Sequence, residues 1–174
     1  AQQQLHLHLP SMPGKFLDPM TALVEVYSPQ ALSEEQQQQI RDQILQHLII
    51  ETNRSFLQDP RFCLLVMSEV GQKAMSSAIN DVGSGISALN ALTRILIDSR
   101  PDPEATRCDY PHLSIECFDL QDLIYGSFMP LARDCAQNLE LNQRLLKCLS
   151  MIEQNVSEPE LRQAATQMAM QVLQ

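Results

Sequence analysis

Helix-start signals recur along residues 31–174, and they constrain the fold more than any other feature of this sequence. Ser33 is followed by Gln36 at the spacing of a capping box, in which each side chain bonds the backbone N–H of the other residue. Asp59 precedes Pro60, a pair that suits an N-cap and the first helical position. Asp119 opens another such segment. Because apolar residues follow each signal at helical spacing, we predict amphipathic helices packed as a bundle.

The expected fold class is mainly α, a bundle of about six helices with a small N-terminal two-stranded β segment. We place this β segment in residues 1–30 and the helical bundle domain in residues 31–174. Residues 5–9 alternate Leu with His, and residues 21–27 are rich in Leu and Val, so each stretch predicts a strand. Two strands alone are marginally stable. We therefore expect them to pack on the helices or to be completed by residues upstream of Ala1.

Composition limits the classes of partner. The 174 residues suit one domain, or one domain with a small appendage. Twelve basic against 21 acidic residues give a net charge of −9, which argues against nucleic acid or an anionic lipid surface as a direct partner. No stretch approaches 18 consecutive apolar residues, so the sequence itself predicts no membrane span.

No metal, cofactor or catalytic motif is predicted. The five cysteines form no C-x-x-C pair, and we expect them to be buried thiols in a reducing compartment. His6 and His8 would lie on one face of a strand, as half a metal site does. No carboxylate or Cys stands at ligand spacing from them, which favours a solvent-facing strand edge instead. The Gly83–Gly85 turn lacks the preceding strand and following Lys of a phosphate loop.

Asn80 and Asp81, which we call the polar corner, interrupt the most apolar, small-residue part of the sequence. One helix is expected to end before them and another to begin after them, so a left-handed Asn and an N-cap Asp explain the pair structurally. The alternative is a small-ligand, metal or anion site, with hydrolysis as one use of it. Its candidate residues are Arg54, Gln58, Asp59, Glu69, Asn80 and Asp81. Glu69 and Lys73 are also spaced for an i,i+4 ion pair.

Two motifs resemble those of a bacterial family of predicted multi-pass membrane proteins, the domain of unknown function 2254. The family patterns R-T-x-x-Q-D-P-x-F-G and A-L-S-P-x-I-N-D-P-x-T-A resemble this sequence at a set of ten positions. They are Arg54, Gln58, Asp59, Pro60, Phe62, Ala74, Ser76, Ile79, Asn80 and Asp81. Pro13, Gly14 and Phe16 resemble the β segment of that family. The two prolines flanking the I-N-D core of the family are Ser77 and Val82 here.

The resemblance implies a soluble C-terminal domain of a membrane protein, with transmembrane helices upstream of Ala1. An even number of spans would place the domain on the cytoplasmic side of the bacterial inner membrane. The family brings no known activity or catalytic residues. The function expected is therefore assembly or regulation of the membrane part, with the protein's own transmembrane region and further copies of the chain as partners.

Overall fold

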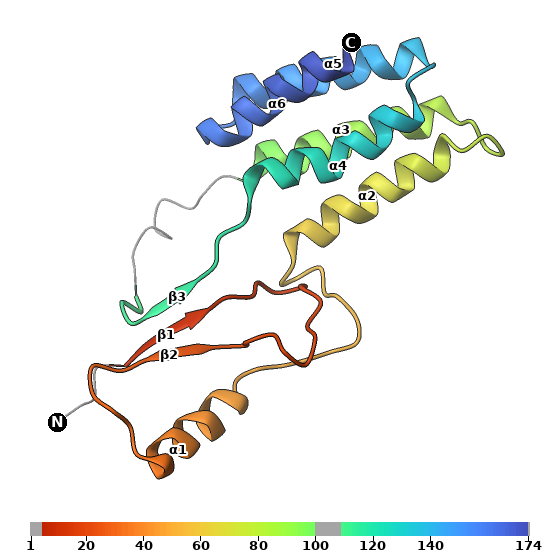
Figure 1. Ribbon diagram of the computed structural model, residues 1–174. Coiled ribbons are helices and arrows are strands. Elements are labelled where there is room, and N and C mark those ends of the chain that lie inside the picture. Colours follow the sequence, from red (N-terminus) through yellow and green to blue (C-terminus); the bar gives the residue numbers. More distant parts are fainter. Residues whose placement is uncertain (1–4, 100–108, 174) are drawn as a thin grey trace. The chain divides into compact units, whose positions relative to one another are not determined.

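The computed structural model describes residues 5–99 and 109–173, and the chain forms two compact units (Figure 1). The first unit comprises Ala1–Gln58 with Thr106–Cys117, and the second comprises Asp59–Ala105 with Phe118–Gln174. This division differs from the predicted boundary at residue 30. The first helix and a late strand belong with the N-terminal strands, and the bundle begins only at Asp59.

Secondary structure in the described residues confirms the mainly α class. The first unit contains β1 (His6–Leu9), β2 (Glu25–Tyr27), α1 (Glu34–Leu45) and β3 (Leu113–Ile115). The second unit contains α2 (Pro60–Ala74), α3 (Val82–Asp98), α4 (Leu120–Asp134), α5 (Leu139–Asn155) and α6 (Pro159–Val172). No helix in these residues is both long and apolar enough to cross a bilayer.

The β segment is a three-stranded sheet rather than the predicted two-stranded one. Its order is β2-β1-β3, with β1 antiparallel to β2 and parallel to β3. Leu7 of β1 lies opposite both Val26 of β2 and Leu113 of β3. The third strand therefore comes from far downstream in the chain. A pairing across more than one hundred residues leaves no signal in local periodicity.

Helix α1 begins at the predicted capping box and ends before its apolar spacing does. Ser33 and Gln36 form the capping box, with the Gln36 N–H donating to Ser33 Oγ at 3.3 Å and the Ser33 N–H donating to Gln36 Oε1 at 3.0 Å. The helix ends at Leu45 instead of continuing through Ile49. No residue of α1 is buried.

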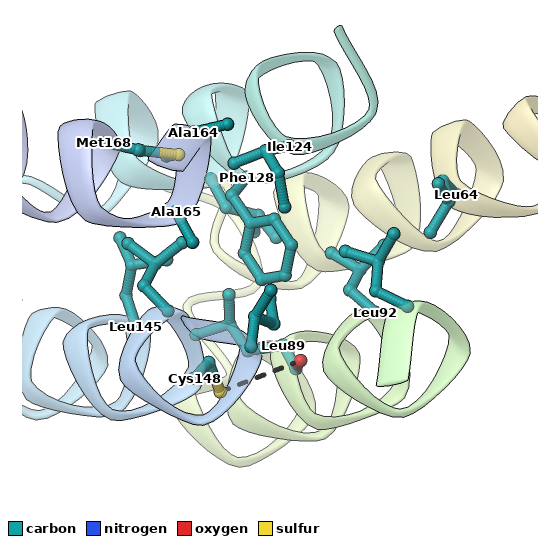
Figure 2. Packing of buried hydrophobic residues seen from close by; sticks show 14 of the residues in the cluster. Leu64, Leu89, Leu92, Ile124, Phe128, Leu145, Cys148, Ala164, Ala165 and Met168 are labelled. Atoms are coloured by element: carbon teal, nitrogen blue, oxygen red, sulfur yellow. Dashed lines mark hydrogen bonds between the residues drawn. The ribbon is translucent and has the colours of Figure 1, made fainter. Parts of the chain in front are cut away.

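The five helices of the second unit form a closed ring around one core. Helix α2 packs on α3, α3 on α5, α5 on α6, α6 on α4, and α4 returns to α2. Figure 2 shows the Phe128 side chain among Ile124, Leu89 and Leu92, and all four are fully buried. Aliphatic side chains make up most of the remaining core. The bundle thus buries its own apolar faces.

Candidate functional site

The polar corner joins α2 to α3, and its first residue reverses the chain direction. Asn80 has a φ of 47°, in the left-handed region that Asn tolerates better than most residues. The Asn80 N–H donates to Ser76 O, and the Asp81 N–H donates to Ala74 O, each at 2.8 Å. The second bond occupies a carbonyl group that the end of α2 leaves open. The predicted left-handed role of Asn80 is confirmed.

Asp81 is the N-cap of α3, as predicted. Its Oδ1 accepts the Ser84 backbone N–H at 3.1 Å, and its Oδ2 accepts the Ser84 hydroxyl at 2.6 Å. These bonds from Ser84 hold the pKa of the Asp81 carboxyl below its usual value, against a smaller opposing effect of desolvation. The corner residue pair therefore has a complete structural explanation in the bonds it makes.

Small residues next to the corner allow close helix packing. Gly85 and Ala88 are buried in the second unit. A Cβ at Gly85 would come within 2.8 Å of Met75 Sδ and 2.9 Å of Leu141 Cδ1. Gly85 therefore lies where α3 closely approaches Met75 and α5. Gly83, Ser84 and Ser87 of the same segment are exposed.

Asp59 caps the other end of α2 and is the most deeply buried carboxylate described. Its side chain is only 1% exposed, and its Oδ1 accepts the Phe62 N–H at 3.2 Å. Arg61 Nε lies 3.8 Å from the same oxygen, and the Arg61 guanidinium lies 5.3 Å from the centre of the Phe118 ring. A buried charge needs such bonds and a counter-charge to be tolerated. Asp59 is therefore a helix N-cap whose buried charge is stabilised by the Phe62 N–H and by Arg61.

Within the second unit, the structure does not bring the predicted site residues Asp59, Glu69, Asn80 and Asp81 together at one point. Asp59 and the polar corner occupy opposite ends of α2, a 15-residue helix that is about 22 Å long. Glu69 and Lys73 are exposed on α2, and no ion pair joins them in the described structure. Arg54 and Gln58 are exposed residues of the first unit.

The cysteines also differ in part from expectation. Cys135 and Cys148 are buried as predicted, whereas Cys117 is exposed, and Cys108 lies outside the described residues. Desolvation by burial, with a smaller contribution from Asp134, raises the pKa of Cys135 to about 11. This thiol is therefore unreactive. In the described residues, no group of three or more His, Cys, Asp or Glu side chains is arranged to hold a metal ion.

Sequence reasoning missed a cavity in the first unit. It has a volume of about 540 Å³ and lies between α1 and residues 23–32. Its apolar lining residues are Leu23, Val24, Val26, Leu32, Ile40, Ile44, Leu45 and Leu48. The spacing of Ile40, Ile44 and Leu48 does predict an apolar face on α1. No local pattern predicts that the sheet segment would leave this face uncovered.

Comparison with known proteins identifies the family. The family model described as predicted membrane protein (DUF2254) matches residues 1–151 of the 174. The chain belongs to this family, as its motifs suggest. Searches of curated proteins and of solved structures find no match.

Proposed function

From membership in a family of predicted membrane proteins, we propose that this chain is an extramembrane domain that assembles or regulates the membrane part of a multi-pass bacterial protein. We propose the cytoplasmic face of the inner membrane as its location. Its partners would be its own transmembrane region and further copies of the chain. The family description supports the association with a membrane protein, and the surface of the first unit supports the docking role.

The observation that carries the proposal is the exposed apolar surface of the first unit. None of its described residues is buried, and Phe16, Met20 and Leu57 are 91%, 92% and 97% exposed. By contrast, the second unit encloses a continuous core. Extended apolar exposure of this kind marks surfaces that are covered by a partner. The open groove beside α1 adds further exposed aliphatic residues, together with the polar side chains of Ser28, Gln30, Gln37 and Arg41.

The cysteines support a cytoplasmic location. All four described cysteines are free thiols, and Cys117 is exposed. Free exposed thiols persist in reducing compartments, whereas secreted domains of this size commonly use disulfides.

The test is the mass of the full-length protein in detergent, measured by light scattering. Phe16→Ser with Leu57→Ser is expected to lower the mass, because it removes apolar contacts with the partner. Leu139→Ser is the matched control, since Leu139 is 71% exposed on the second unit. An unchanged mass for the double variant, or an equal loss for the control, would contradict assembly of copies through the first unit.

A further inference from the structure

The cavity beside α1 combines apolar walls with a small number of polar side chains, and we call it the α1 groove. Its volume of about 540 Å³ lies within the range of about 300–1,000 Å³ that is typical of small-molecule pockets. Besides its eight apolar lining residues, the groove is lined by Ser28, Gln30, Gln37 and Arg41. This lining suits a molecule that is mostly apolar and carries one polar group.

The polar side chains of the lining lie toward the start of α1. Residues 23–32 lead directly into the helix, and Gln37 Nε2 donates to Leu32 O at 3.1 Å. In Figure 1 the chain turns back after β2 into α1. Ser28 and Gln30 are close to this turn in the sequence, so they lie near the same end of the groove as Gln37.

The other end of the groove is apolar. Ile44 is in the last turn of α1, and Leu48 follows it. On the opposite wall, Leu23 and Val24 are the lining residues farthest from the turn into α1. All four side chains are half-buried. An aliphatic chain placed against them would leave water, which is favourable in proportion to the apolar area removed.

Arg41 lies on α1 between these two ends, and it is the only charged residue of the lining. In the part of the chain that the structure describes, no carboxylate forms an ion pair with Arg41, and the neighbouring Asp42 carboxylate accepts Gln38 Nε2 at 2.9 Å. A guanidinium binds a carboxylate through two parallel N–H···O bonds. The acidic groups elsewhere on the chain act weakly here, because salt screens distant charges.

We propose that the α1 groove binds a single-chain fatty acid. The carboxylate pairs with Arg41, and the aliphatic tail lies between Ile44 and Leu23. A ligand that binds only the folded state stabilises it, so the fatty acid also stabilises the first unit. The site is separate from the residues that test the docking role, since Phe16 and Leu57 do not line the groove.

Calorimetric titration of the 174-residue chain with octanoate, decanoate, laurate and myristate tests the apolar end. Below the micelle concentrations, affinity is expected to rise about fourfold for each added methylene until the tail outgrows the groove. Ile44→Ser should weaken laurate binding about tenfold. Ile49→Ser is the matched control, because Ile49 is 79% exposed and does not line the groove. An affinity independent of chain length, or equal losses in the two variants, would overturn the proposal.

The carboxylate contact is tested by combining Arg41→Gln with a change of ligand. This variant should bind laurate about fivefold more weakly, whereas its affinity for dodecanol, an uncharged alcohol with a similar tail, should be unchanged. Lys15→Gln is the charge-matched control, since Lys15 is exposed in the first unit and does not line the groove. The proposal is wrong if Arg41→Gln weakens both ligands equally, or if Lys15→Gln weakens laurate as much.

A measurement on the unmodified chain applies if a variant does not fold. Stearate with a nitroxide near its methyl end is added, and methyl resonances are followed by NMR. The label is expected to broaden Leu23, Ile44 and Leu48 more than Met20, which is 92% exposed and does not line the groove. Equal broadening of Met20 would mean that the tail associates with any exposed apolar residue. No broadening in the groove would leave it to a protein segment, such as one from a second copy. Either result contradicts the proposal.

Discussion

The polar corner shows how two adjacent residues set the junction between two helices. Asn80 adopts a left-handed conformation in the turn that follows α2, and Asp81 supplies the oxygens that cap the start of α3. Neither residue needs a ligand to explain its chemistry. The charge of Asp81 nevertheless has a measurable consequence, because its bonds favour the ionised form in the folded state only.

We predict that Asp81→Asn makes the protein less sensitive to acid. The folded pKa of Asp81 lies below its usual value, so its contribution to stability is complete above about pH 4 and is lost as pH falls through the folded pKa. Asn still caps the helix but does not titrate there. The difference in melting temperature between wild type and variant should therefore shrink from pH 6 to pH 3.

The control for this prediction is at the other end of the same helix. Asp98 is exposed in the last turn of α3, where a negative charge opposes the helix dipole. Asp98→Asn should not reproduce the effect. A constant difference in melting temperature between wild type and Asp81→Asn across the pH range would mean that the bonds from Ser84 do not favour the charged carboxylate.

Local residue roles were predictable from the sequence, whereas long-range partners were not. Asp81 and Asp59 each cap a helix that begins at the next residue, and each accepts a backbone N–H three residues later. Their roles therefore depend only on neighbouring residues in the sequence. The partner of His6 and His8 is Ser114, more than one hundred residues away. The sequence predicted correctly that the two histidines share a strand face, but β1 is the central strand and both residues are half-buried, so the predicted solvent-facing strand edge is wrong. It contained no signal for the hydroxyl between them.

At the scale of elements, helix contacts in the bundle depend on glycines with no room for a side chain. A Cβ at Gly71 in α2 would lie 2.7 Å from Leu131 Cδ2 and 3.0 Å from Ala88 Cβ. By contrast, a Cβ at Gly126 in α4 would meet nothing within 4 Å. Both positions are inside helices, so alanine brings the same gain in helix propensity to each. Comparing alanine at the two positions therefore separates the effect of side-chain packing on stability from the effect of helix propensity.

We predict opposite effects of alanine at these two glycines. Gly71→Ala should lower the free energy of unfolding by about 1–3 kcal/mol, because Ala88 and Leu131 must move to admit the methyl group. Gly126→Ala should raise it by about 0.5–1 kcal/mol through reduced backbone entropy of the unfolded chain. Urea denaturation of both variants measures the difference. Equal stabilisation by Gly71→Ala and Gly126→Ala would show that the helices around Gly71 pack less tightly than they do in the structure.

Element boundaries illustrate where periodicity fails. The apolar spacing that predicts α1 continues to Ile49, but the helix ends at Leu45, and none of its residues is buried. In the bundle, every predicted helix has neighbours on both sides, and the same periodicity identifies the helices correctly. Pattern reasoning therefore works where tertiary packing supports the pattern, and it overextends a helix where packing is absent.

At the scale of the whole molecule, the two units differ in what stabilises them. The second unit has a ring of five helices and a continuous core, whereas the described part of the first unit has no buried residue. Hydrophobic burial is the main favourable term in folding. The first unit on its own must therefore open more readily, and its order depends on what covers its apolar residues or joins its strands.

Hydrogen exchange should display this difference directly. We expect amides of β1 and α1 to exchange at least tenfold faster than amides of α3 and α5, because local opening is least costly where few apolar contacts are lost. Mass spectrometry of peptides from the 174-residue chain in metal-free buffer makes the comparison. The backbone amides of β1 would then exchange quickly even though their hydrogen bonds to the neighbouring strands are formed. Equal protection in both units would show that the first unit is stable without a partner, and the docking role proposed from its exposed residues would lose its physical basis.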